Sequence, residues 1–258
     1  MINPYLISSP FRTRKENSMR LQLNAVGDDE MALSEHIEEF SQRLVFCLTL
    51  LVLTTIVCFI DVREIVKIFQ APALGVKFLQ FTPGEYFFAS VKIAAFCGLL
   101  ISSPAILYQL FLYVVPGMTK KERDILLPVS LGSGLLFVIG LIFSYFFLVP
   151  AALRFFIAYG AEVVEPFWSF DQYFDFVAVL LFTTGIAFQV PVVQVILGVL
   201  GLVSGEKMLS AWKYVVVICT IISAVITPST DPVTQILMSL ALLGLYLGGS
   251  GFVILLKK

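Results

Sequence analysis

Hydrophobic residues recur along the chain in long runs, and the lengths of these runs predict membrane-spanning helices. Runs such as 44–60 and 129–152 contain no charged side chain, and about 20 consecutive apolar residues suffice to cross a bilayer as an α-helix. We predict six spans, at 44–60, 85–115, 120–153, 173–200, 212–226 and 234–255. The predicted fold class is therefore all-α, a polytopic membrane protein with six transmembrane helices.

The predicted spans differ in length. The second and third are longer than the ~30 Å hydrocarbon core requires, so they must tilt, bend or protrude. Pro104 and Pro191 lie within spans and Pro150 lies near the end of one, and each removes a backbone hydrogen bond and can bend its helix. The fifth span is the opposite case, because only 13 residues separate Lys213 from Thr227.

Two amphipathic patterns flank the first span. Before it, Leu33, Ile37, Phe40 and Leu44 recur at helical spacing, which predicts a helix that leads into the span. After it, an apolar face formed by Val62, Ile65, Val66 and Phe69 predicts a short helix on the membrane surface that stops near Pro72. A packed connector without a specific role is the alternative for the second pattern.

Composition supports a membrane protein and excludes several other classes. Hydrophobic residues make up 59% of the chain and charged residues 14%, against about 45–50% and 25% in soluble domains. The net charge of −1 offers no basic excess for nucleic acid. Four cysteines lie inside apolar runs, one histidine is present, and no nucleotide-binding motif occurs. We therefore expect no cofactor, no metal site and no nucleic-acid partner. We expect the chain to be embedded in a lipid bilayer.

Positive charges predict the orientation. Twelve lysines and arginines fall on the side of the N-terminus and four on the opposite side, with Lys92 inside the second span. The positive-inside rule then places both termini in the cytoplasm or stroma. Residues 1–32 form a polar extension without the apolar core of a signal peptide, and 33–256 form the membrane domain. Residues 1–18 can instead precede a true start at Met19, or the beginning of the chain can be a short transit peptide.

Four groups of polar residues at membrane edges or within spans are the candidates for function, because such residues are costly in a membrane. They are 35–43, 116–124, 188–191 and 227–235. Each also has a structural explanation. Glu39 and Arg43 can form an i,i+4 ion pair, Thr119 and Glu122 fit a helix capping box, and Gln189 can bond to a neighbouring helix.

Taken together and in this order, these groups make the chain resemble the C subunit of the twin-arginine protein translocase, the TatC family, over residues 33–256. The motifs that carry the resemblance are His36-Ile37-Glu38-Glu39-Phe40 with Arg43-Leu44, 103–109 (SPAILYQ), Lys121-Glu122-Arg123, Phe188-Gln189-Val190-Pro191, and Thr227-Pro228 with Asp231 and Gln235. The resemblance implies a concave, glove-like bundle with short fifth and sixth helices. It also implies a receptor and core subunit that binds twin-arginine signal peptides and exports folded proteins with the proton-motive force.

The resemblance also assigns site residues and partners. The signal-peptide-binding residues are Glu39, Glu122, Arg43, Tyr113 and Lys121. The residues that dock partners or hold the fold are Pro72, Gln189, Thr227, Asp231 and Gln235. The implied partners are single-span subunits of the TatA and TatB type and the signal peptides of folded cargo, in a hetero-oligomer with several copies. The chain departs from the common pattern at Ser41, where bacterial members often have arginine, and at Gln189, where they often have glutamate.

Two other classes of function compete with this interpretation. A small-molecule or ion transporter would need several ionisable groups at the membrane midplane, and the interiors of the predicted spans contain little beyond Lys92 and Gln189. A membrane enzyme would need a catalytic set, which the sequence lacks, so we expect no enzymatic activity. The expected location is a plastid thylakoid membrane or a bacterial or cyanobacterial inner membrane.

Overall fold

The computed structural model describes residues 37–73, 76–114, 120–160, 167–227 and 231–256, and these residues are mostly helical. The chain divides into two units, the first ending at Phe46 and the second beginning at Cys47. The described part of the first unit, residues 37–46, belongs to the first helix, which is described over Ile37–Ile60. This helix is continuous from the amphipathic segment into the first predicted span, as the sequence predicted.

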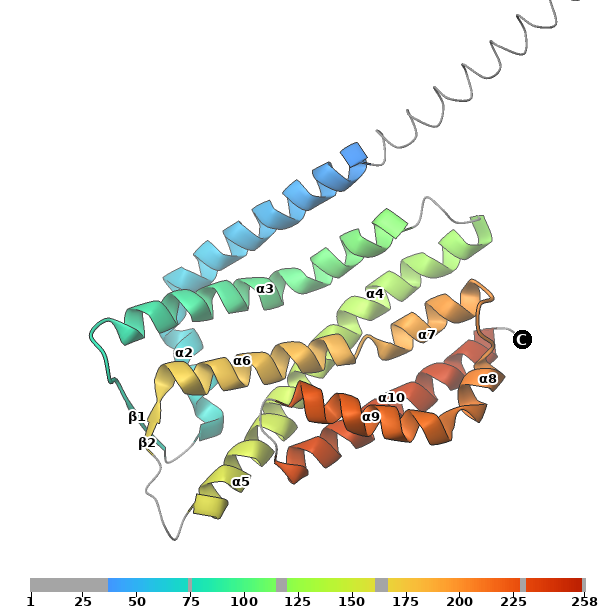
Figure 1. The fold of residues 1–258 in the computed structure, drawn as a ribbon. Helices are drawn as coiled ribbons and strands as arrows, with labels where there is room; N and C mark the ends of the chain where they lie inside the picture. Colours follow the sequence, from blue (N-terminus) through green and yellow to red (C-terminus); the bar gives the residue numbers. More distant parts are fainter. Residues whose placement is uncertain (1–36, 74–75, 115–119, 161–166, 228–230, 257–258) are drawn as a thin grey trace, which may run out of the picture. The chain divides into compact units, whose positions relative to one another are not determined.

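All six predicted spans are helical. The bounds are Glu85–Val114 (α3), Lys120–Phe143 (α4), Ser144–Leu148 (a π-helix, η3), Val149–Gly160 (α5), Phe170–Ala187 (α6), Val190–Val199 (α7), Gly205–Ser210 (α8), Trp212–Ile226 (α9) and Pro232–Leu256 (α10). The third span joins α4, η3 and α5, and the fourth joins α6 and α7 (Figure 1). Within the described ranges, five helices are long and apolar enough to cross a membrane, and α9, the predicted fifth span, is a shorter apolar helix. The sixth span, α10, has 25 residues, so it is not short as the resemblance implied.

Two prolines act as the sequence predicted. Span four is interrupted at Phe188 and Gln189, and Pro191 lies in the first turn of α7. Pro104 stays inside α3, where it cannot donate to the carbonyl of Leu100. The hydroxyl of Ser103 donates to that carbonyl at 2.6 Å and so satisfies the acceptor that the proline leaves open.

The short amphipathic helix is confirmed as α2, Val62–Gln70, followed by a 3₁₀ turn, Ala71–Ala73 (η1). Val66 and Phe69 face inward and are buried. The hydroxyl of Tyr173 donates to the carbonyl of Phe69 at 2.6 Å, and that of Tyr145 donates to Ile68 at 2.7 Å. Two tyrosines from spans three and four thus bond the last turn of α2.

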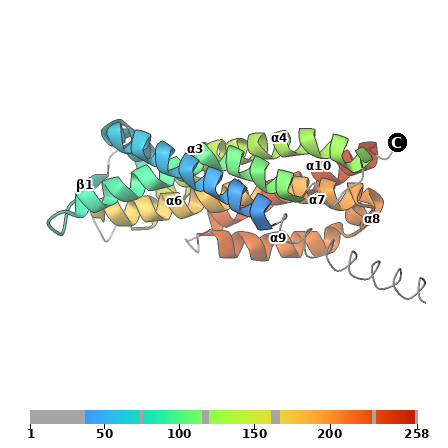
Figure 2. The same ribbon diagram turned by 90° about the horizontal axis from the view of Figure 1, so that it is seen from above.

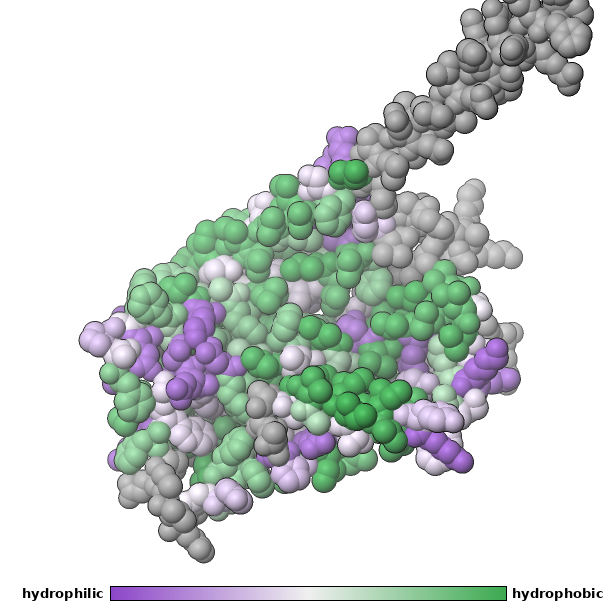
Figure 3. Space-filling model, viewed as in Figure 1, coloured by the Kyte–Doolittle hydropathy of each residue, from purple (hydrophilic) through white to green (hydrophobic). Residues whose placement is uncertain are grey.

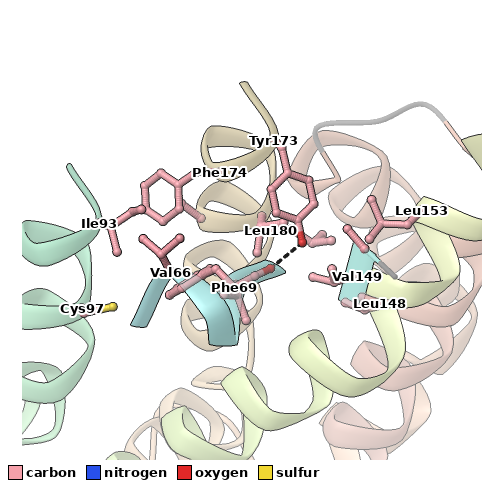
Figure 4. Packing of buried hydrophobic residues seen from close by; sticks show 14 of the residues in the cluster. Val66, Phe69, Ile93, Cys97, Leu148, Val149, Leu153, Tyr173, Phe174 and Leu180 are labelled. Carbon is pink, nitrogen blue, oxygen red and sulfur yellow. Dashed lines mark hydrogen bonds between the residues drawn. The ribbon is translucent and has the colours of Figure 1, made fainter. Parts of the chain in front are cut away.

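The main core lies where α2 meets α3, α5 and α6 (Figure 4). The ring centroid of Phe69 lies 5.3 Å from that of Phe174 and 6.2 Å from that of Phe96, both in edge-to-face arrangements. Such pairs add to the dispersion energy of simple burial. Leu148 and Leu180 are completely buried beside them. The contacts fix α2 against the spans, which both the surface helix and the packed connector allow.

A small parallel sheet was not predicted. Lys77–Leu79 (β1) pairs with Phe167–Ser169 (β2), so two distant loops are joined. Glu85 reinforces the junction, because its carboxylate accepts hydrogen bonds from the Ser169 hydroxyl at 2.6 Å and from the backbone of Phe81 at 2.7 Å. Strands of three residues are too short to show an alternating pattern in sequence.

The second unit has two distinct ends. The sheet and α2 lie at one end, whereas the beginning of α4, helix α8 and the end of α10 lie at the other (Figure 1). Helix α10 packs on α7 and on α9, as the two ribbon views agree (Figures 1 and 2). Hydrophobic side chains cover most of the face drawn in Figure 3, as expected for a surface that contacts lipid.

Candidate functional site

The first predicted carboxylate, Glu39, is paired with Arg43 one turn further along the first helix. Arg43 donates from Nη2 and Nε to the same oxygen, Glu39 Oε1, at 2.6 and 3.0 Å. The predicted i,i+4 ion pair is therefore confirmed. Because both bonds end on Oε1, the other carboxylate oxygen can accept further donors. The arrangement holds Glu39 as a charged acceptor in the segment that precedes the first span.

The second predicted carboxylate, Glu122, is the third residue of α4, which begins at Lys120. The structure describes the backbone of this turn, and the side chains of Lys121 and Glu122 lie outside the described part, as does Thr119 of the predicted capping box. Tyr113 is half-buried near the end of α3. The structure thus gives Glu122 a position in the first turn of a helix, where a negative charge is favourable.

Gln189 lies at the interruption of span four and is bonded at both ends of its amide. The hydroxyl of Ser133 on α4 donates to Gln189 Oε1 at 2.6 Å. Gln189 Nε2 donates to the backbone carbonyl of Ser133 at 3.2 Å. The predicted bond to a neighbouring helix is therefore present, and it is formed with α4.

A second glutamine of the same span, Gln194, is buried and was not predicted as a site. Its Nε2 donates to the Ser250 hydroxyl at 2.9 Å and to the carbonyl of Tyr246 at 3.1 Å, both on α10. Its oxygen is close to the position that a Cβ on Gly249 would take. The signal in the sequence was the amide itself, five residues beyond Gln189. The contacts tie α7 to α10.

The predicted turn before span six is an N-terminal helix cap. Asp231 is buried and accepts from the backbone N–H of Thr234 at 2.8 Å and from its hydroxyl at 2.5 Å. Thr227 donates to the carbonyl of Ser223 at 2.8 Å and so ends α9. Gln235 donates to the carbonyl of Thr220 at 3.5 Å. Pro228 lies outside the described residues. Asp231 therefore caps the beginning of α10, and Gln235 lies on the edge between α9 and α10.

An ion cluster on α3 and α6 was only partly anticipated. Lys92 Nζ lies 2.8 Å from Asp171 Oδ1 and 2.9 Å from Asp175 Oδ1. Lys92 was predicted inside the second span, whereas Asp175 lies inside the predicted fourth span and was missed. Lys92 is 43% exposed, so the cluster lies at the surface of the helices. It links spans two and four close to the sheet end of the molecule.

Pro72 occupies the middle of the η1 turn directly after α2 and is half-buried. Its position agrees with the predicted end of the short helix. The predicted site residues thus fall into three groups. Glu39 and Arg43 lie on the first helix before the first predicted span, and Tyr113, Lys121 and Glu122 lie at the end of α3 and the beginning of α4. Gln189 lies within a span, and Pro72, Thr227, Asp231 and Gln235 lie at turns or at the beginning of a helix.

Comparison with protein families gives one extensive match. The model of the family described as Sec-independent protein translocase protein (TatC) matches residues 35–240. That match covers the first helix, both predicted carboxylates and the beginning of α10.

Individual relatives extend the match to nearly the whole chain. An uncharacterized tatC-like protein of Porphyra purpurea is 54% identical over 231 residues, which are 90% of this chain and 91% of the relative. The Sec-independent protein translocase protein TatC of Synechocystis is 52% identical over 92% of this chain and 93% of its own. The chloroplastic protein TATC of Pisum sativum is 51% identical over 88% of this chain and 65% of its own.

A solved structure shares the fold. A crystal structure of the twin-arginine translocase receptor TatC matches with a TM-score of 0.70 and 34% sequence identity. The match covers 86% of this chain and 98% of that one.

Proposed function

Because the chain belongs to the TatC family of Sec-independent protein translocase components, we propose that it is the receptor subunit that binds twin-arginine signal peptides. The chain is a multi-pass membrane protein of protein transport. In the proposal, Glu39 and Glu122 each bind a guanidinium group of the arginine pair. The observation that carries it is the match of residues 35–240, which include both carboxylates, to the TatC family model.

The chemistry of the carboxylates supports this role. Arginine binds carboxylates through paired, charge-assisted hydrogen bonds that lysine cannot reproduce. Glu39 already forms such a contact with Arg43, whose donors end on one oxygen. An incoming guanidinium can bind the second oxygen or replace Arg43. Tyr113 and Lys121 complete the proposed site at the end of α3 and the beginning of α4.

The proposed translocation step places the chain in a hetero-oligomer. Single-span subunits of the TatA and TatB type dock on it, and folded cargo crosses the membrane with the proton-motive force. Both termini lie in the stroma or cytoplasm in this proposal, and the membrane is a thylakoid or a bacterial or cyanobacterial inner membrane. Relatives named as chloroplastic and cyanobacterial support that placement.

Substitution of the two carboxylates tests the proposal. Glu39→Ala and Glu122→Ala should each weaken binding of a twin-arginine peptide, because losing one partner of a close charge pair costs about 2–5 kcal/mol. Binding is measured with a fluorescent synthetic peptide on membranes that contain the full chain. Glu38→Ala and Asp124→Ala, which remove neighbouring charges, are the matched controls. Wild-type affinity in both test variants would refute the proposal.

A further inference from the structure

An aromatic pocket lies at the sheet end of the second unit, and none of the site residues discussed above belongs to its described lining. It lies between the end of α5 and the beginning of α6, beside β2 (Figure 1). Its volume is about 460 Å³, within the ~300–1,000 Å³ of typical ligand pockets. Among the described residues, its aromatic lining consists of Phe81, Phe156, Phe167, Trp168, Tyr173 and Phe176. The pocket therefore offers uncharged aromatic surface at the ends of spans three and four.

The pocket has a buried floor and an exposed rim. Tyr173 belongs to the floor, because it is 4% exposed and its hydroxyl already donates to the carbonyl of Phe69. Phe81 and Phe167 belong to the rim and are 65% and 50% exposed. The ring of Trp168 is stacked on that of Tyr173, with centroids 6.2 Å apart and an angle of 20° between the planes. A ligand in the pocket would contact aromatic rings and would cover the exposed rim.

Two polar groups of the lining are open to a ligand. Within the part of the chain that the structure describes, neither the side-chain amide of Gln172 nor the indole N–H of Trp168 has a hydrogen-bond partner. Ser169 also lines the pocket, but its hydroxyl already donates to Glu85 at 2.6 Å. The described lining contains no aspartate, glutamate, lysine or arginine. The pocket can therefore donate and accept hydrogen bonds, but it offers no charge to balance an ionic ligand.

These properties fit the sugar headgroup of a lipid. One face of a hexose ring carries C–H groups and packs on aromatic rings, whereas the hydroxyls at its edge bond to amide and indole groups. Aromatic side chains with a polar group are typical of the membrane–water interface, where headgroups lie. A phosphate headgroup would need a lysine or arginine, and the described lining supplies neither. An acyl chain would cover the amide of Gln172 and leave it without a hydrogen bond, which is unfavourable.

We propose that this pocket binds the sugar headgroup of a neutral glycolipid. The bound lipid connects the end of span three to the beginning of span four, because the lining comes from α5, β2 and α6. A ligand that binds only the folded chain stabilises it, so the glycolipid stabilises this end of the molecule. The inference does not depend on the proposed binding of signal peptides.

Tryptophan fluorescence tests the proposal, because the chain has two tryptophans, Trp168 and Trp212. Trp212 begins α9 and is not part of the described lining, so Trp212→Phe leaves Trp168 as the only reporter. The full chain is placed in phosphatidylcholine nanodiscs that contain monogalactosyl diacylglycerol with brominated acyl chains, which quench fluorescence on contact. Phosphatidylcholine and diacylglycerol with the same brominated chains are the comparison lipids. The galactolipid should reach half-maximal quenching at an about tenfold lower mole fraction than either comparison lipid.

Two further substitutions in the Trp212→Phe background test the lining. Gln172→Leu removes the open amide, and Phe81→Ala removes an exposed ring of the rim. Each should raise the half-quenching mole fraction of the galactolipid to about that of phosphatidylcholine, because the headgroup loses a hydrogen bond or an aromatic contact. Phe87→Ala is the matched control, because Phe87 is 59% exposed in the first turn of α3 and is not part of the described lining.

The outcomes decide between the sugar, the acyl chains and another location. A preference for the galactolipid that is lost in Gln172→Leu or Phe81→Ala and retained in Phe87→Ala supports the proposal. Equal quenching by the galactolipid and phosphatidylcholine overturns it, whatever the variants show. Equal quenching by the galactolipid and diacylglycerol means that the acyl chains are recognised, and it also overturns the proposal. A preference that survives in both lining variants means that the sugar binds elsewhere, and the pocket is then refuted as its site.

Discussion

The amide of Gln189 shows how one polar side chain is accommodated within a predicted span. Both ends of the amide bond to Ser133, through its hydroxyl and its backbone carbonyl. The contact lies where the helix is interrupted, at the turn of Phe188 and Gln189 between α6 and α7. The contact stabilises the packing of span four on α4. From the family resemblance we propose a second role for Gln189, as a docking point for a partner helix.

A pair of substitutions separates the two roles of Gln189. Gln189→Leu should block transport and spare insertion and signal-peptide binding if a partner docks on the amide. Ser133→Ala removes the hydroxyl bond, worth about 0.6–2 kcal/mol in membranes, and should retain transport. Insertion, peptide crosslinking and cargo transport are measured for both variants. Equal loss of transport in the two would show that the bond itself is what matters.

Local spacing in the sequence predicts side-chain contacts between residues one helical turn apart but not contacts between distant helices. The pair Glu39–Arg43 followed from i,i+4 spacing, and the partner required by Gln189 followed from the cost of an unpaired amide. The identity of that partner could not be predicted from the sequence, because Ser133 lies 56 positions away from Gln189. Gln194 was missed although its amide is as visible in the sequence as that of Gln189. Its partners on α10, Tyr246 and Ser250, are 52 and 56 positions away and are known only from the folded chain.

At the scale of helices, the cluster of Lys92 with Asp171 and Asp175 connects α3 to α6. One cation serves two carboxylates, so removing the cation leaves two like charges, whereas removing Asp175 leaves the pair of Lys92 with Asp171. Substitution of Lys92 should therefore cost more stability than substitution of Asp175, whatever the strength of each single bond.

We predict that Lys92→Met destabilises the protein more than Asp175→Asn. The difference should be about 1 kcal/mol, the upper range for exposed ion pairs. Thermal unfolding of the full chain in lipid nanodiscs measures it. Additional replacement of both aspartates by asparagine should restore stability to Lys92→Met. Equal unfolding temperatures for the two single variants would contradict the asymmetry.

The predicted elements were most reliable where apolar runs were long. All six spans were located from long apolar runs, within a few residues at most ends, and α2 was located from hydrophobic periodicity. The π-helix η3 and the β1–β2 sheet were not predicted, because both depend on long-range contacts. Ser144 of η3 donates to the carbonyl of Leu180 at 3.2 Å, and Glu85 bonds to Ser169 beside the sheet.

At the scale of the whole molecule, the short fifth span favours assembly with other helices. Helix α9 has 15 residues, or about 22 Å, against ~30 Å of hydrocarbon. The polar edge of Gln235 and Thr220 lies where α9 meets α10. Single-span helices can cover such an edge and reduce the local mismatch with the bilayer.

We therefore predict that the active form is a hetero-oligomer with several copies of the chain. Blue-native electrophoresis of mildly solubilised membranes should show a complex far larger than the 28.6 kDa chain. Gln235→Leu should reduce the yield of that complex and leave insertion unchanged, with Gly251→Leu as a control on the same helix. A species of the size of one chain that still supports transport would refute this.

Recognition of two adjacent arginines is tested most directly by comparing two peptides in native membranes. One signal peptide carries Arg-Arg and the other Lys-Lys in an otherwise identical sequence, each with a photoreactive group beside the pair. Because lysine cannot reproduce the paired hydrogen bonds of arginine, the wild-type chain should be labelled strongly by the Arg-Arg peptide and weakly by the Lys-Lys peptide. Equal labelling by the two peptides would contradict a twin-arginine receptor.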